Sequence, residues 1–255
     1  MSAPTEHVTL SHQDLPPLLL EEHDHFARLI EAAKKLEPMP TAVVCPDDAN
    51  SLKGTLLAMR AGLIIPILIG SKVKIEEAAK ASHEDLTLIQ IIDIPDHVAA
   101  AAKAVELVHS NQVRAIMKGN LHSDELLAQV VKKEGGLRAS RRISHVFAMN
   151  VPTLDHPLFI SDAAINIAPD LMTKVDITQN AIDLAQACGI ASPLVAIMSA
   201  VETINVNIPS SMEAAILAKM ADRGQITGGI VDGPLAMDNA IDMGAAKTKK
   251  LESPV

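Results

Sequence analysis

The sequence predicts an α/β fold in which the strands of a parallel sheet alternate with helices. Short runs of Ile, Val and Leu alternate along the chain with segments whose apolar residues recur at helical spacing, a pattern typical of repeated strand–helix units. Several of these runs are apolar almost throughout, as expected of strands that are covered on both faces. We therefore expect doubly wound sheets.

Each expected strand is a short aliphatic run bounded by residues that favour turns. The expected strands cover residues 41–45, 63–69, 86–92, 113–118, 143–149, 158–161, 194–198 and 226–231. Pro66 weakens the assignment of the second strand, because proline removes a backbone N–H from the ladder. Several strands end at Gly, Asp, Asn or Ser, and such sheets bind ligands at the carboxyl ends of their strands.

The expected helices follow these strands at most positions. They cover residues 18–36, 51–62, 96–111, 123–133, 176–188 and 210–221. Asp47 and Asp48 precede the second helix as candidate N-caps, and Gly62 follows it as a candidate C-cap. The chain is expected to divide into a lobe of residues 1–147, with a flexible tail over residues 1–15, and a lobe of residues 148–255. The cleft between the two lobes is the expected site.

Composition favours a protein that handles small molecules. The formal charge is −9 and the chain has 3 Phe, 0 Trp and 0 Tyr, whereas nucleic-acid surfaces are basic or carry stacking aromatics. No apolar run approaches the roughly 20 residues of a membrane helix, and no secretory signal is recognised. Cys45 and Cys188 are isolated, so a cytoplasmic location with buried thiols is expected. The HExxH and Cys-His patterns of metal sites are absent, so we expect no metal.

A first candidate site follows the strand at residues 113–118. It comprises Lys118, Asn120, His122 and Ser123, with Gly119 allowing close approach of a ligand. Ser123 is a candidate N-cap, and the amides of a helix N-terminus bind phosphate well. Asp124 and Glu125 argue against an anion there, because acids in the first turn already satisfy the helix dipole. The alternative is an ordinary capped turn.

Arg138, Arg141 and Arg142 form the densest cationic group of the chain, and Ser144 follows them closely. The planar guanidinium fork suits phosphate and carboxylate oxygens. The alternative is a solvated basic loop.

Two further groups of candidates follow or end strands. Asp162 and Asn166 come after residues 158–161, and their alternative is a simple helix cap. Asp232, Pro234 and Asp238 come after residues 226–231, where an acid is expected to lead directly into a tight turn.

In a series of ordered blocks, the chain resembles the phosphate acetyltransferase and phosphate butyryltransferase family. The blocks are MKGNLHS, GLRASRRISHVFAMNVP, FISDAAINIAPD, ADRGQITGGIVDGPLAMDNA and KLESPV. Details such as GNLHS and VDGPLAMDNA are most similar to the butyryl-type branch and to the acyltransferase half of enoyl-CoA hydratase fusions. The resemblance implies a two-lobed α/β fold similar to isocitrate and isopropylmalate dehydrogenases, usually in a homodimer.

The resemblance also implies an activity. Acyl-CoA and phosphate would be converted reversibly to acyl phosphate and CoA by direct transfer, with CoA as a substrate and no cofactor. Carried over block by block, the candidate residues named above become substrate-binding residues, with the arginines on phosphate groups and Ser144 and Asn166 on acyl phosphate oxygens. The family's catalytic Ser, Arg and Asp fall in a segment beyond Val255, so catalytic residues stay unknown and the second lobe is expected to be incomplete, lacking C-terminal strands.

The sequence leaves two alternatives open. One is a metal- and NAD-dependent dehydrogenase of the same fold superfamily, for which Asp232, Asp238 and Asp242 are the candidate metal ligands. The other is an inactive fragment that binds CoA or phosphate.

Overall fold

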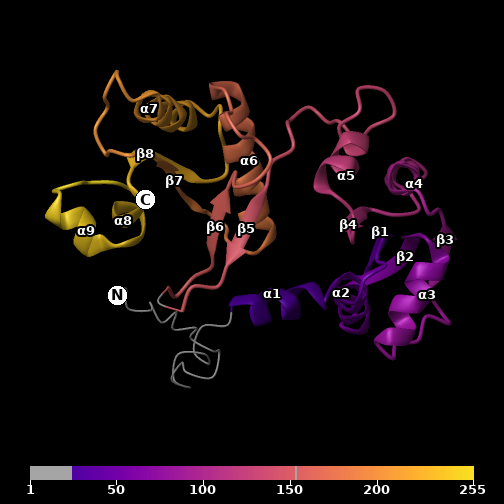
Figure 1. The fold of residues 1–255 in the computed structure, drawn as a ribbon. Coiled ribbons are helices and arrows are strands. Elements are labelled where there is room, and N and C mark those ends of the chain that lie inside the picture. The colour runs from indigo at the N-terminus through magenta and orange to yellow at the C-terminus, as the bar shows by residue number, and fades with distance from the viewer. Residues whose placement is uncertain (1–24, 153) are drawn as a thin grey trace, which may run out of the picture. The chain divides into compact units, whose positions relative to one another are not determined.

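The computed structural model describes residues 25–152 and 154–255 of the chain (Figure 1). The chain divides into two compact units between residues 141 and 142, whereas the sequence placed the boundary between residues 147 and 148. We call residues 27–141 the first unit, and residues 25–26 with 142–255 the second unit. The expected tail over residues 1–15 and the start of the expected helix at residue 18 lie outside the described residues.

The first unit contains a four-stranded sheet whose strands all run parallel. Its strands are β1 (Met39–Val44), β2 (Ile64–Gly70), β3 (Gln90–Asp93) and β4 (Ala115–Lys118), in the order β3-β2-β1-β4. Its helices are α2 (Ala49–Arg60), α3 (Lys72–Ala81), α4 (His97–His109) and α5 (Ser123–Val130), together with α1 (His25–Ala33) from Ala27 onward. Helix α3 was not expected from the sequence, although Ser71 caps it by accepting a bond from the Lys74 amide.

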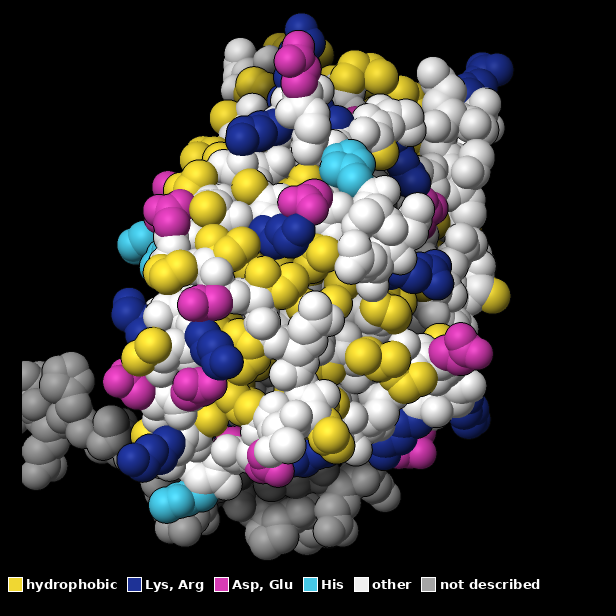
Figure 2. Space-filling view, turned by 90° about the vertical axis from the view of Figure 1, so that its right-hand side faces the viewer, with side chains coloured by type: hydrophobic (Ala, Val, Ile, Leu, Met, Phe, Trp, Pro, Cys, Tyr) yellow, Lys and Arg dark blue, Asp and Glu magenta, His cyan; other side chains and the backbone are white. Residues whose placement is uncertain are grey.

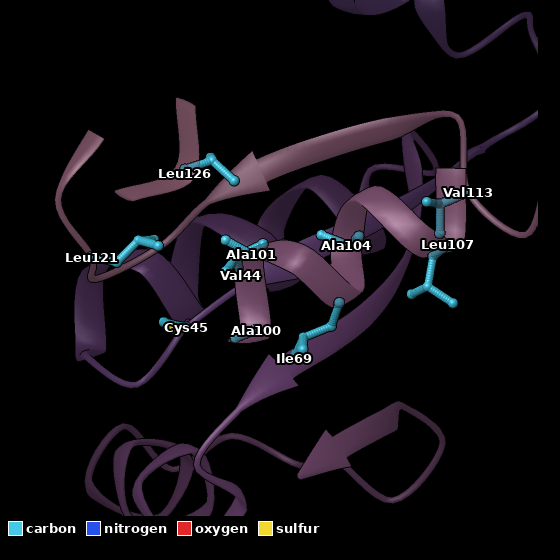
Figure 3. Packing of buried hydrophobic residues seen from close by; sticks show 11 residues of the cluster. Val44, Cys45, Ile69, Ala100, Ala101, Ala104, Leu107, Val113, Leu121 and Leu126 are labelled. Carbon is cyan, nitrogen blue, oxygen red and sulfur yellow. The ribbon is translucent and has the colours of Figure 1, made fainter. Parts of the chain in front are cut away.

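Helices cover both faces of this sheet. Val43 and Leu68 pack with Leu52, Leu56 and Ile75 of α2 and α3 on one face. Alternate strand residues turn to the other face, and there they meet α4 and the segment around α5. Figure 3 shows that second cluster, which includes Val44, Ile69, Ala101, Ala104, Leu107, Leu121 and Leu126. The doubly wound arrangement expected from the sequence is therefore present in the first unit.

Pro66 lies in β2, which is an internal strand, contrary to the reservation raised by the sequence. The Leu63 and Ile69 carbonyls accept bonds on the β1 side, from Met39 N (2.9 Å) and Cys45 N (2.7 Å). The backbone N–H and C=O groups of successive residues in a strand point alternately to its two neighbouring strands. The backbone nitrogen of Pro66 therefore faces β3. Pairing with β3 begins only at Ile67. The missing N–H of proline therefore costs no bond of the ladder.

The second unit differs from the expected parallel pattern. Strands β5 (Val146–Met149) and β6 (Leu158–Ser161) form an antiparallel hairpin, whereas β7 (Leu194–Met198) and β8 (Ile230–Leu235) pair in parallel. Only a loop joins β5 to β6, so an antiparallel pairing is the one that the chain can make there. The helices are α6 (Leu171–Ala187), α7 (Pro209–Asp222), α8 (Met237–Ile241) and α9 (Met243–Thr248). None of the helices in the described part of the chain is long and apolar enough to cross a membrane.

The core of the second unit lies between the β7–β8 pair and helices α6 and α7. Ile182, Leu217, Ile226 and Val231 are its buried members. Helix α6 begins earlier than expected because Asp170 caps it, its carboxylate accepting a bond from the Thr173 amide at 2.7 Å. This long, anchored helix provides a rigid support for the segment described below.

Candidate functional site

The first unit has a topological switch point between β1 and β4. The chain runs from β1 to β2 and β3 on one side, and then crosses to β4 on the other side of β1. In an open parallel sheet, the crevice for a ligand lies outside the carboxyl ends of the strands at this point. The segments there are residues 45–48 after β1 and residues 119–123 after β4, which include the first group of sequence candidates.

The backbone around Gly119 lies against the end of β1. Gly119 N donates to Val44 O at 2.8 Å, and Asn120 N donates to Cys45 O at 2.7 Å. A Cβ atom on residue 119 would lie 2.4 Å from Cys45 O and 2.6 Å from Val44 O, so only glycine fits. Asn120 Nδ2 also donates to Asp47 Oδ1 at 3.0 Å, which links the two loops at the switch point.

The other members of this group are engaged locally. Lys118 Nζ donates to the carbonyls of Gly119 (3.1 Å) and Leu121 (2.9 Å). The N-cap of α5 is His122, whose amide donates to Glu125 Oε2 at 3.0 Å. Ser123 is the first residue of the helix and not its cap, which corrects the expectation from the sequence.

Carboxylates already occupy the helix N-termini at this edge of the sheet. Asp48 accepts from the Asn50 and Ser51 amides of α2, and Asp96 accepts from the Ala99 amide of α4. Glu125 occupies the start of α5. An anion would have to displace these acids to reach the amides, so the first unit offers a ligand mainly its exposed polar side chains.

The three arginines are divided between the units. Arg138 is exposed, and its Nε donates to Val131 O at the end of α5 (2.6 Å). Arg138 and Arg141 belong to the first unit, whereas Arg142 begins the second.

On the face shown in Figure 2, Lys and Arg side chains are interspersed with Asp and Glu, so that face carries no continuous patch of one charge.

The second unit brings Arg142, Ser144, Asp162 and Asn166 together. Asn166 Nδ2 donates to Ile143 O at 3.1 Å and also to Asp162 Oδ2. The loop after β6 is therefore bonded to the segment before β5 at Ile143, the residue between the candidates Arg142 and Ser144.

Asp162 organises the loop that follows β6. Its carboxylate accepts bonds of 3.0 Å from the amides of Ala164, Ile165 and Asn166. Burial raises the pKa of this carboxyl, but the hydrogen bonds from those amides and from the Asn166 side chain outweigh burial and lower the pKa to about 2. Asp162 is therefore ionised at neutral pH, with its oxygens committed to the loop.

A pocket of about 330 Å³ lies beside this loop. Arg142 and Asn166 line it, together with Asp170 and Thr173 at the start of α6. Bonds from Thr173 and the charge of Arg142 lower the pKa of the Asp170 carboxyl. The pocket is open to solvent, and Arg142 is the cationic residue among those that line it.

Arg142 and Ser144 are held by two residues that the sequence did not single out. Arg142 N donates to Asp176 Oδ2 at 3.0 Å. Asn180 Nδ2 donates to Arg142 O and to Ser144 Oγ, both at 2.9 Å. Both residues lie in the middle of α6, where nothing in a single sequence separates a functional polar residue from a solvated one.

The last group of candidates lies in and after β8. The sequence placed Asp232 and Pro234 in a turn, but both lie within β8, because pairing with β7 continues past them through an irregularity at Ala196–Met198. Asp232 Oδ2 accepts from Ser253 Oγ at 2.5 Å, and Asp238 Oδ2 lies 3.6 Å from Lys249 Nζ.

These contacts bear on the dehydrogenase alternative. Asp242, its third candidate ligand, caps α9 by accepting from Gly244 N at 2.6 Å. Within residues 25–152 and 154–255, no group of three or more His, Cys, Asp or Glu side chains could hold a metal ion. Asp232, Asp238 and Asp242 therefore do not form the metal site that this alternative requires.

Comparisons with known proteins agree on one family. The model of the family described as phosphate acetyl/butaryl transferase matches residues 97–255. A phosphate acetyltransferase of Rhizobium meliloti is 53% identical over 230 residues, which are 90% of this chain and 73% of that protein. A phosphate butyryltransferase of Clostridium beijerinckii is 39% identical over 231 residues, 91% of this chain and 76% of that protein.

Solved structures show the same fold. A phosphotransacetylase from Streptococcus pyogenes matches with a TM-score of 0.72 at 17% identity, over 90% of this chain and 78% of that one. A branched-chain phosphotransacylase from Enterococcus faecalis V583 matches with a TM-score of 0.67 at 24% identity, over 85% of this chain and 75% of that one. The α/β class expected from the sequence is confirmed. No comparison supports the dehydrogenase alternative.

Proposed function

This chain belongs to the phosphate acetyl/butaryl transferase family and is an acyltransferase, and on that premise we propose that Arg142 and Ser144 bind the phosphate that accepts the acyl group. The reaction converts acyl-CoA and phosphate reversibly to acyl phosphate and CoA. The observation that carries the proposal is the pocket of about 330 Å³ lined by Arg142 and Asn166. Arg142 supplies charge and paired N–H donors for phosphate oxygens.

The reaction requires one phosphate oxygen to attack and the other phosphate oxygens to be held in place. An oxygen of phosphate attacks the thioester carbonyl carbon, a C–O bond forms, and the C–S bond breaks with its electron pair leaving on sulfur. The proton that phosphate loses on becoming acyl phosphate ends on the CoA thiolate. A fixed guanidinium holds the phosphate oxygens that do not react, and positioning of two bound reactants supplies much of the acceleration.

Asn166 acts indirectly in this scheme. Its amide N–H groups are spent on Ile143 O and Asp162, so it shapes the pocket wall instead of donating to phosphate. For the CoA end we propose the loop at the switch point of the first unit, where Asn120, His122 and Ser123 are exposed.

Steady-state kinetics tests the phosphate site. Thiol release from acetyl-CoA and from butyryl-CoA is followed at varied phosphate concentration for the wild type and for Arg142→Gln. We expect a rise of about tenfold or more in the KM for phosphate, because loss of a charged hydrogen bond costs about 1.5–3 kcal/mol. Arg223→Gln is the matched control, since Arg223 is exposed at the end of α7. An unchanged KM for phosphate in Arg142→Gln contradicts the assignment.

The higher organisation follows from the same resemblance. We propose a cytoplasmic homodimer whose subunits have the two-lobed arrangement of isocitrate and isopropylmalate dehydrogenases. The support is the family resemblance together with the α/β units described above. Light scattering after size exclusion decides the oligomeric state, since a dimer has twice the 27.0 kDa mass of the chain.

A further inference from the structure

Two side chains of α6 hold the segment that carries the proposed phosphate ligands. Asp176 and Asn180 are four residues apart in the sequence, so they lie on the same face of the helix. Both are half-buried. Asp176 accepts the Arg142 amide, and Asn180 donates to the Arg142 carbonyl and to the Ser144 hydroxyl oxygen. One face of α6 therefore binds both the amide and the carbonyl of Arg142.

These bonds engage the Arg142 backbone and the Ile143 carbonyl and leave the Arg142 side chain to the pocket. The Ile143 carbonyl is taken by Asn166 at 3.1 Å, and the Arg142 amide and carbonyl are taken by α6. Arg142 also lines the pocket. A segment without regular secondary structure is thus held in one conformation by side chains from two other segments.

Asn180 also determines the direction of the Ser144 hydroxyl. The Arg142 carbonyl can only accept a bond, so the Asn180 nitrogen must face it, and the same nitrogen then donates to Ser144 Oγ. Because Ser144 Oγ accepts this bond, its own proton is directed elsewhere. The asparagine therefore makes Ser144 a hydrogen-bond donor, which is the property that a phosphate oxygen requires.

We propose that Asp176 and Asn180 are positioning residues that preset Arg142 and Ser144 for the phosphate oxygens. The proposal rests on the proposed function, because it assumes that Arg142 and Ser144 meet phosphate. Support of this kind from a rigid helix is what keeps a binding group within the narrow geometry that a site needs.

Variants that exchange a hydrogen-bond donor for an acceptor at the same side-chain size distinguish a positioning role from a packing role. Asn180→Asp keeps the shape of the side chain but can only accept, so it pulls the Ser144 proton away from the ligand and faces the Arg142 carbonyl without a donor. Asn180→Ala removes both bonds. Asp176→Asn keeps an oxygen that accepts the Arg142 amide and serves as the conservative rescue, whereas Asp176→Ala lacks it. Asp183→Ala is the control, since Asp183 is an exposed acid two turns further along α6.

The readout is the KM for phosphate set against the KM for acyl-CoA. We expect Asn180→Asp, Asn180→Ala and Asp176→Ala to raise the KM for phosphate by about fivefold or more, as the loss of one hydrogen bond does, with the KM for acyl-CoA within about twofold of wild type. Asp176→Asn and Asp183→Ala are expected to resemble wild type. Calorimetric titration with inorganic phosphate gives the same comparison without turnover.

The results separate this inference from the proposed function. If Arg142→Gln weakens phosphate binding but the Asn180 and Asp176 variants do not, the positioning role is wrong and the phosphate site stands. An equal rise in both KM values also overturns the positioning role, since it indicates general damage. If Arg142→Gln leaves phosphate binding unchanged, the phosphate site itself is wrong.

Discussion

Replacement of Gly119 by alanine tests how closely the switch point is packed. The added Cβ would lie 2.4 Å from Cys45 O and 2.6 Å from Val44 O, well inside the optimal separation of about 3.5–4.0 Å. Both oxygens belong to the backbone and cannot rotate away. They also accept the bonds from Gly119 N and Asn120 N, so any movement that relieves the contact weakens two hydrogen bonds.

The expected cost lies at the upper end of that for an overpacked core, about 3 kcal/mol. For a chain of this length, that corresponds to a fall of roughly 6–12 °C in the thermal midpoint. Circular dichroism during heating measures the change. Gly54→Ala is the control. Gly54 lies within helix α2, and a Cβ there would meet only Met117 Cε, at 3.9 Å. Alanine within a helix is more stable than glycine by about 0.5–1 kcal/mol. A Gly119→Ala midpoint equal to or above that of Gly54→Ala would show that the backbone around residue 119 has room for a side chain.

Three other predictions concern single side chains. The pKa of Asp162 is lowered from 3.8 to about 2, so the stability that its carboxylate contributes is present above pH 3.8 and is lost as the pH falls through about 2. Urea unfolding should therefore show that Asp162→Asn is less stable than the wild type at pH 6 only. An equal loss of stability at pH 6 and pH 2 contradicts this. Asn120→Ala removes the bond to Asp47, and we expect the KM for acyl-CoA to rise by about two- to fivefold with the thermal midpoint nearly unchanged; an unaltered KM removes Asn120 from the CoA site. Burial and the neighbouring carboxylates, Asp47 foremost, raise the pKa of the Cys45 thiol to about 11, so a thiol reagent at pH 7 should leave Cys45 unmodified in the folded protein. Mass spectrometry before and after unfolding checks this, and rapid labelling of folded Cys45 would show that the thiol is accessible.

The fold of the first unit could be predicted from the sequence because local and global signals agree there. The β-branched runs around Val43 and Leu68 are apolar on both sides, and acids such as Asp48 and Asp96 mark the helix starts. The sequence failed where a pairing partner decides the outcome. Pro66 is acceptable in β2 only because β3 begins beyond it, which no single strand reveals.

The site was only partly predictable, for a similar reason. Strand ends mark Asn120, Asp162 and Asn166 as candidates, since polar residues after buried strands are conspicuous. Asp176 and Asn180 carry no such mark, because a polar residue within a helix is usually solvated. Only the structure reveals their hydrogen bonds to the segment that begins at Arg142.

Identification of the product tests whether the acyl group is transferred to phosphate. Acetyl-CoA and phosphate are incubated with the protein, and ³¹P NMR follows the phosphorus signals while free thiol is assayed in the same sample. We expect acetyl phosphate to appear in the same amount as the released thiol, and Arg142→Gln to lower both together. Thiol release without acetyl phosphate would show hydrolysis of the thioester and would contradict transfer to phosphate.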